Sequence, residues 1–406
     1  MLVRELVQEP GSPWLDELVL LVAPVYNADG NERVRLSNRP RQNGPLGGMG
    51  QRPNAEGLDL NRDHMKLDSP EARSLVSMLN AYDPEVAVDL HTTNGTRHAY
   101  HLTYSPALHP GTAPELDRLL RDEALPRITD AIRRTDGWEY YYYGNARRGP
   151  DGEMGWYTFD HRPRFNNNYM GLRNRVAILS EAYAYATLQD RVVATRRFVE
   201  EILDWAAVSV SGVRSAIAAA EAPLAGEALP LRATFQGSDE PVAILMGAVE
   251  ELRHPYTGAI ILNRLDSAVA TPMREYGTFA ATETGRVPSR YLIPEAEEEA
   301  LDRLHAHGIQ TSVLESTFEL RGEVFRVDSV SMAEREFQAR RERVVHGEWV
   351  ALDTVLTPGT RVLDTAQPLG RLAFYLLEPR SDDGFANWGI LGDSTAPGRW
   401  PVLRER

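Results

Sequence analysis

The sequence has no cysteine, and that absence excludes disulfide bonds and metal sites built from thiolate ligands. A metal ion could be held only by histidine, aspartate or glutamate side chains. The sequence also has no run of about 18 or more apolar residues, so it encodes no transmembrane helix. Lysine and arginine form no basic block, and the net charge of −14 argues against nucleic acid as the main partner.

The composition that is present is that of a globular protein, with 42% hydrophobic and 25% charged residues in a chain of 406. This length is enough for two or three domains with a sizeable core. The character of the sequence changes near Ser211-Gly212. We predict one domain over residues 1–211 and an accessory α+β region over residues 212–406, to which the sequence assigns no role.

The first residues of the chain are unusual for the start of a domain. They contain no cationic segment followed by an apolar core, so they are not a signal peptide. Leu2 and Leu6 instead predict a helix that begins without a capping residue. We therefore expect the natural reading frame to begin further upstream.

Three short apolar runs predict buried strands in the first domain: Leu18–Ala23, Val86–Leu90 and Val176–Leu179. Ionisable side chains, His91 and Glu181, stand at the carboxyl ends of the second and third runs. Ligands of open α/β sheets bind at the carboxyl ends of strands, so both side chains are candidates for a functional site. A histidine at a strand end is more often structural, so its role depends on which residues converge on it.

Helical signals lie between these strands. Residues 69–80 begin with a serine cap, a proline at the first position and an acid in the first turn, which predicts a helix. The order strand, long loop, helix, strand is that of a βαβ crossover, so we predict an α/β fold with a parallel or mixed sheet. Apolar spacing predicts further helices over residues 114–134, 187–210, 214–222 and 294–307, and β-prone runs predict strands that include residues 231–235, 242–246, 312–319, 324–330, 349–355 and 372–377.

Four segments stand in a characteristic order: Pro24–Gly30, Gly57–Arg62, Asp89–His91 and Ile178–Glu181. Together they resemble the motifs of the zinc carboxypeptidase family, the metallocarboxypeptidases related to pancreatic carboxypeptidase A, over about residues 13–205. The resemblance implies an α/β domain with a mixed, mostly parallel sheet of about eight strands, helices on both faces and one zinc ion at the strand ends.

The resemblance also implies roles for single residues. His91 would be one of three zinc ligands, and Glu181 the general base that takes a proton from zinc-bound water. Asp89 lies two residues before His91 on the same strand face, where it could orient the site or serve as an ordinary capping or packing residue. A mobile tyrosine of the family that closes over the substrate corresponds best to Tyr169, with Tyr157 as the alternative.

Arginine and asparagine would bind the substrate. By resemblance, Asn61 and Arg62 would hold the free carboxylate at the end of a peptide, which suits the planar, two-pronged guanidinium. A further arginine of the family stabilises the oxyanion at the scissile carbonyl. Arg39 and Arg41 both match it, and we prefer Arg39.

One departure from the family concerns the metal. The family's first two zinc ligands come from a His-x-x-Glu motif that precedes the strand assigned to Leu18–Ala23, and the 17 residues before that strand contain no histidine. A single imidazole does not hold zinc against water, so we expect this chain to bind zinc weakly or not at all. Either the gene model is truncated or the chain is a genuine fragment that has lost its metal, and the helix that begins without a cap favours truncation. Four other histidines lie at the wrong point in the order: His64, His98, His101 and His109.

The parent activity is hydrolysis of a peptide bond, by zinc-activated water, next to a free carboxylate. Two alternatives are a catalytically inactive protein that binds peptides or carboxylates, and a zinc amidase or deacylase acting on acylated amino acids. In each case the partner is a peptide or an acylated amino acid with a free carboxylate.

Overall fold

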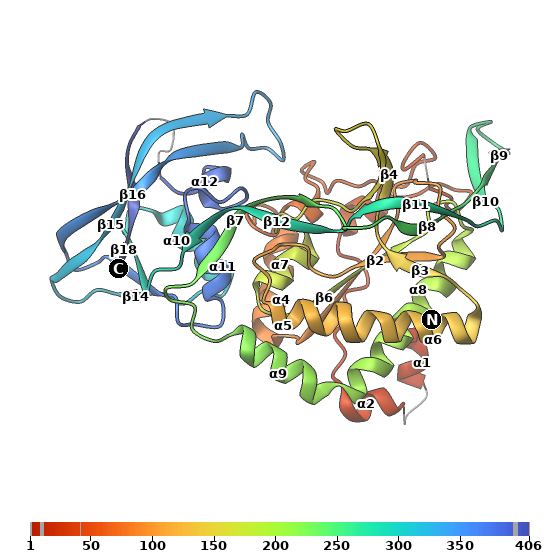
Figure 1. The fold of residues 1–406 in the computed structure, drawn as a ribbon, viewed down its shortest axis with the longest axis horizontal. Helices are drawn as coiled ribbons and strands as arrows, with labels where there is room; N and C mark the ends of the chain where they lie inside the picture. Colours follow the sequence, from red (N-terminus) through yellow and green to blue (C-terminus); the bar gives the residue numbers. More distant parts are fainter. Residues whose placement is uncertain (1, 9–11, 41, 393–396, 406) are drawn as a thin grey trace.

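A computed structural model describes residues 2–8, 12–40, 42–392 and 397–405 of the chain. Two regions lie beside each other, and the two termini are at opposite ends of the molecule (Figure 1). The predicted oxyanion candidate Arg41 lies outside the described residues. In the part of the chain that the structure describes, no single helix is long and apolar enough to cross a membrane, although α8 (Leu188–Val208) and α9 (Val210–Ala220), bent by 81° at their junction, pass that test as a pair.

The first region is built on a four-stranded sheet with the order β1-β6-β2-β3. The pairs β1–β6 and β2–β3 are parallel, and β2–β6 is antiparallel. The predicted α/β class with a mixed sheet is therefore confirmed, although four strands are present in the described residues rather than about eight. The strands are β1 (Val86–Thr92), β2 (Leu102–Ser105), β3 (Tyr140–Tyr142) and β6 (Val176–Ala182).

Helices cover both faces of this sheet. Alternate side chains of β6 point to opposite faces, and the apolar ones on each face are buried against helices. Ile178 packs in one apolar core with Phe198 of α8, whereas Ala177 packs in the other with Val76 of α4. The Ser69 side chain caps α4 as predicted, by accepting a hydrogen bond from the Ala72 amide. The helices and turns of this region are α1 (Leu2–Gln8), α2 (Pro13–Glu17), α3 (Ala28–Glu32), η1 (Leu60–Arg62), α4 (Pro70–Tyr82), α5 (Pro114–Arg118), η2 (Leu119–Ala124), α6 (Leu125–Asp136), α7 (Asn166–Leu172), α8 and α9.

The prediction of a buried strand over Leu18–Ala23 is wrong. This segment is in no strand, and the side chain of Val19 is 90% exposed. The strand β1 forms as predicted but is not buried, since it lies at the edge of the sheet and Leu90 is 52% exposed. An apolar run is buried only where other segments of the protein cover it. Strand β1 pairs with a neighbouring strand on one side alone, so its other side is left uncovered.

The second region contains most of the strands of the molecule. The prediction of a strand over residues 372–377 is wrong, because these residues form helix α11, which is buried on all sides and so shows no helical period of polar residues. The elements are β7 (Ala228–Gln236), β8 (Val242–Met246), β9 (Val249–Arg253), β10 (Ile260–Arg264), β11 (Val269–Tyr276), β12 (Thr278–Arg286), β13 (Arg290–Ile293), α10 (Glu298–Ala306), β14 (Ser312–Val313), β15 (Phe318–Met332), β16 (Arg343–Leu356), β17 (Arg361–Asp364), α11 (Gly370–Leu377), α12 (Phe385–Trp388) and β18 (Gly398–Glu405).

The two regions pack against each other and pair strands, so they are not two separate domains joined by a linker alone. Helix α9 begins where we placed the boundary, yet Val213 and Ile217 pack in the core of the first region with Phe198. Strand β11 of the second region pairs in parallel with β5 (Met154–Tyr157), which itself pairs with β4 (Asn145–Arg148). The β7–β12 ribbon, the two-stranded sheet of β7 and β12, runs from the second region across the first (Figure 1).

Candidate active site at the ends of β1 and β6

The two ionisable residues predicted at the strand ends are direct neighbours. In the parallel pairing of β1 with β6, His91 is the register partner of Glu181. Register partners on adjacent strands project from the same face of a sheet, so the imidazole and the carboxylate come from one edge of the fold. The structure thus brings together two of the residues that the sequence selected independently.

His91 already has a charged partner. Its Nε2 lies 2.7 Å from Oδ2 of Asp89, so the two side chains form an ion pair. Burial disfavours the imidazolium, but the negative charge of Asp89 outweighs it and raises the pKa of His91 to about 9. At neutral pH His91 is therefore protonated in the metal-free protein.

Glu181 is in the environment of a proton acceptor. Burial raises the pKa of its carboxyl to about 7, against the positive charges of His91 and Arg52. Its Oε2 is buried and has no hydrogen-bond partner among the described residues. A carboxyl with a pKa near the ambient pH is suited to accept and return a proton.

Asn61 and Arg62 lie in the short turn η1, which is fixed at both ends by aspartates. Asp59 caps the turn by accepting a hydrogen bond from the Asn61 amide at 3.1 Å. Asp63 is fully buried and accepts from the Ser69 amide at 2.7 Å and from the Ser69 hydroxyl at 2.6 Å. The turn is thereby anchored to the first residues of α4.

Arg62 is a cation without an anion. Its guanidinium stacks on the Phe165 ring at 3.9 Å and donates to the carbonyl of Asn61, and no carboxylate of the described residues forms an ion pair with it. Burial and the charge of Arg52 lower the pKa of Arg62 to about 10, although Asp59 opposes the shift. A carboxylate arriving beside Arg62 would be favoured by its charge and by the free edge of the guanidinium.

A third arginine, Arg52, influences the residues at the strand ends more than Arg39, the predicted oxyanion residue, does. The charge of Arg52 acts on both His91 and Glu181, and its Nε lies 2.6 Å from Oδ2 of Asp59. Arg39 has a pKa lowered by burial and by Arg52, but it is not among the charges that act on Glu181. The sequence shows Arg52 only as one of several arginines in a loop, so spacing alone gives no signal for it.

The structure does not bring Tyr169 into this site. Tyr169 is fully buried in α7, and its hydroxyl lies 2.8 Å from Nδ1 of His307 in the second region. A tyrosine that closes over a substrate has to reach solvent. The alternative, Tyr157, is also buried and stacks on Tyr276, whereas Tyr143 has a pKa raised to about 12 by burial and by the charge of Glu181, which places Tyr143 beside the candidate base.

The residues present do not fit a zinc ion. The described part of the chain contains no group of three or more His, Asp or Glu side chains that could hold a metal. His91 lies at the end of β1 with Asp89 as its ion-pair partner, and a single imidazole does not hold zinc against water. The expectation of weak or absent zinc binding therefore remains a prediction for the chain as given.

The ion pair between His91 and Asp89 leads us to expect that the stability of the protein depends on pH. A group whose folded pKa is raised stabilises the fold fully below its unfolded pKa of about 6.5, and this stabilisation is lost as the pH rises through the folded value. For His91 the folded pKa is about 9, so we expect the free energy of unfolding of metal-free protein to fall by about 2 kcal/mol between pH 7.5 and pH 10. Urea unfolding in the presence of a chelator measures this.

The matching control is Asp89→Asn, which removes the charge that holds the proton on His91. This variant should show a much smaller change in unfolding free energy over the same pH range. A wild-type protein whose stability is constant or rises from pH 7.5 to pH 10 would contradict the ion pair.

Comparison with known proteins gives relatives that align over nearly the whole chain. A protein of Trichophyton rubrum named Carboxypeptidase 2 is 22% identical over 412 aligned residues, which span 96% of this chain and 69% of the relative. A Trichophyton tonsurans protein of the same name is 23% identical over 416 residues with the same coverage. No protein-family model matches the chain.

Solved structures give a weaker likeness. A metallo-carboxypeptidase from Pseudomonas aeruginosa, solved in complex with (2-guanidinoethylmercapto)succinic acid, has 19% identity and a TM-score of 0.35, and the match covers 51% of each chain. A metallo-carboxypeptidase from Burkholderia cenocepacia has 15% identity and a TM-score of 0.28, over 42% of this chain and 43% of that one. This chain thus spans about half or less of the solved structures that it matches.

Proposed function

The curated relatives support a relationship between this chain and the zinc carboxypeptidase family, and from that relationship we propose that the chain binds peptides by their free C-terminal carboxylate in a metallocarboxypeptidase-type site. Asn61 and Arg62 bind the carboxylate, and Glu181 would be the proton acceptor of a complete hydrolase. An acylated amino acid ends in the same carboxylate, so it belongs to the same ligand class.

The observation that carries the proposal is the state of Arg62. It is a half-buried guanidinium, stacked on one face, with no carboxylate partner in the described residues. Cations in protein interiors are normally paired, and leaving one unpaired is costly. A bound carboxylate supplies the missing charge through two parallel hydrogen bonds. In a protein of net charge −14 this local positive charge also attracts an anionic ligand.

The position of Glu181 supports a proton-transfer role near that carboxylate. The charges of Glu181, Arg52 and Arg62 all act on the pKa of the Tyr143 hydroxyl, which supports a location of these side chains near one another. With a pKa of about 7, Glu181 can take a proton from a nucleophilic water and return it to a leaving amine. Activating that water is the task of a metal in the related enzymes, and the described residues do not supply a metal site.

We therefore propose that the chain by itself binds its ligand and does not hydrolyse it. This proposal corresponds to the inactive binding protein rather than to the complete hydrolase, because the described residues contain no group of three or more His, Asp or Glu side chains that could hold a metal. Hydrolysis of a peptide or of an acylated amino acid then requires metal ligands from outside the described residues.

Calorimetry with matched peptides tests the proposal. An acetylated tripeptide with a free C-terminal carboxylate should bind about 30-fold more tightly than the same peptide with a C-terminal amide, because the amide lacks the charge that pairs with Arg62. Equimolar zinc should leave both affinities unchanged, and product analysis should show no cleavage. Equal binding of the acid and the amide would contradict carboxylate recognition, and zinc-dependent cleavage by this chain would contradict the absence of a metal site.

A further inference from the structure

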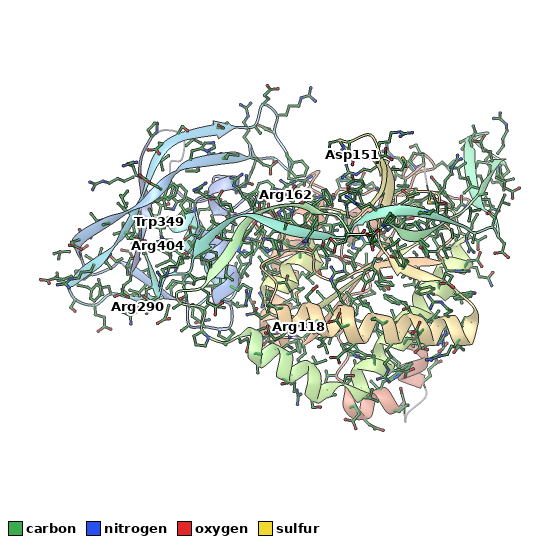
Figure 2. The ribbon with its side chains drawn as sticks, viewed as in Figure 1. Arg118, Asp151, Arg162, Arg290, Trp349 and Arg404 are labelled. Atoms are coloured by element: carbon green, nitrogen blue, oxygen red, sulfur yellow. The ribbon has the colours of Figure 1, made fainter. Side chains whose placement is uncertain are left out.

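A cavity of about 580 Å³ lies where the two regions meet. One wall comes from the β4–β5 hairpin and the loop that follows it, through residues such as Arg147 and Tyr157. The opposite wall comes from the β7–β12 ribbon through Phe235 and Phe279. Figure 2 shows Arg162, from the loop after β5, beside the ribbon, and Asp151 at the tip of the hairpin.

Aromatic rings in this cavity hold one arginine in place. The guanidinium carbon of Arg147 lies 4.1 Å from the centre of the Tyr157 ring and 5.3 Å from that of Phe235. Tyr157 is itself stacked on Tyr276 at 4.1 Å, so the platform under the arginine is rigid. Stacking uses the faces of a guanidinium and leaves its N–H groups free at the edge.

The other charged groups of the cavity wall are already paired. Nε of Arg162 donates to Oδ2 of Asp160 at 2.8 Å, and His161 lies 3.1 Å from Asp382. The guanidinium of Arg147, in contrast, forms no ion pair or hydrogen bond with any of the described residues, and it lies against the two rings. The cavity therefore combines apolar walls with one cation that has free donors.

The cavity adjoins the candidate active site. Asn145 lines the cavity and donates to the hydroxyl of Tyr143, the tyrosine on which the charge of Glu181 acts. Asp160 also lines the cavity, and its charge acts on Arg62. Arg62 stacks on Phe165, whose ring centre lies 5.1 Å from that of Phe159, a residue of the cavity wall. We therefore expect a peptide held by Arg62 to place a neighbouring side chain in the cavity.

We propose that this cavity is a side-chain pocket for acidic residues, in which Arg147 pairs with the carboxylate of an aspartate or glutamate near the C-terminus of the bound peptide. The inference rests on the proposed function, and it gives that function a substrate class: peptides with an acidic side chain in one of the last two positions. The methylene groups of a glutamate lie against the aromatic walls, and its carboxylate meets the free edge of Arg147. The second region then takes part in recognition, because its ribbon forms one wall.

Matched peptides again provide the test. Acetylated tripeptides with glutamate in the last or the penultimate position are compared by calorimetry with the same peptides containing glutamine. We expect one of the two glutamate peptides to bind about tenfold more tightly than its glutamine partner, and Arg147→Gln to abolish that difference. Arg147 is exposed, so the substitution leaves the fold intact.

Arg148→Gln is the control, since Arg148 is the next residue of β4, points to the other side of the strand and donates to the carbonyl of Gly152. It should retain the preference for glutamate. If the peptides bind with equal affinity to wild type and to Arg147→Gln, the pocket assignment is wrong while carboxylate recognition stands. If no peptide binds, the proposed function fails, and glutarate is then titrated by nuclear magnetic resonance. Glutarate binding that Arg147→Gln abolishes supports the pocket without the proposed function, and absence of glutarate binding overturns the pocket as well.

Discussion

Replacing Asp63 by alanine is expected to lower the free energy of unfolding by about 3 kcal/mol. The Asp63 carboxylate is fully buried and pairs with the buried ammonium of Lys66. It also accepts hydrogen bonds from the amides of Asp68 and Ser69 and from the Ser69 hydroxyl. Removing it leaves several buried donors without a partner, and each such group costs about 1–3 kcal/mol unless water reaches it. Urea unfolding followed by circular dichroism measures the loss.

The control for this prediction is an aspartate that pairs at the surface. Asp302 is 57% exposed and forms ion pairs with Arg73 and Arg303. Because exposed pairs contribute little, Asp302→Ala should change the unfolding free energy by less than about 1 kcal/mol. Asp63→Asn, which keeps an acceptor but loses the charge, should lie between the two. Similar losses for Asp63→Ala and Asp302→Ala would show that the anchor under η1 does not contribute as described.

This anchor connects stability with binding. Asp63 immediately follows Arg62, and its hydrogen bonds to Ser69 join η1 to the start of α4. A binding residue in a short turn is positioned only as well as the turn is fixed. The Asp63 variants should therefore weaken peptide binding even under conditions in which they remain folded.

Local signals in the sequence were enough to predict many of the elements. The cap at Ser69, the proline after it and the apolar spacing of residues 187–210 each depend on neighbours within a few positions, and α4 and α8 form where they indicate. The strand ends at His91 and Glu181 were predicted for the same reason. What the sequence could not supply was the register of β1 with β6, which makes these two side chains neighbours.

The wrong secondary-structure predictions concern segments whose burial depends on residues far away in the sequence. Leu18–Ala23 and residues 372–377 are both apolar runs, yet the first is an extended, exposed segment and the second a buried helix. An apolar run by itself does not indicate whether the segment forms a strand or a helix, or which other elements cover it. The cavity around Arg147 was out of reach for a related reason, because Phe235 comes from a strand that is far away in the sequence.

The second region contributes strands next to the candidate site, and its sequence alone did not predict this. Its strand β11 continues the β4–β5 hairpin, and its ribbon closes the cavity beside the candidate site. The alignment with the curated relatives spans 96% of the chain, so this region is shared with them. Because it completes a wall beside the candidate site, we expect this region to take part in ligand binding.

Replacing Arg62 by glutamine is expected to weaken binding of a peptide with a free C-terminal carboxylate by about 100-fold, since a charge-assisted, two-pronged hydrogen bond is replaced by a neutral one. Binding of the corresponding peptide amide should change little. The difference between the two ligands is what distinguishes loss of carboxylate recognition from a general disturbance of the site. Calorimetry on both ligands measures it.

Arg118→Gln is the matched control, because Arg118 lies on α5 (Figure 2), is 65% exposed and has a surface ion pair to Glu115. It changes the net charge of the protein equally, so any effect of overall charge on an anionic ligand appears in both variants. If Arg62→Gln and Arg118→Gln weaken binding to the same small extent, the attraction is long-range and Arg62 is not the carboxylate site. If only Arg62→Gln loses the distinction between acid and amide, the unpaired guanidinium on Phe165 is the group that binds the end of the peptide.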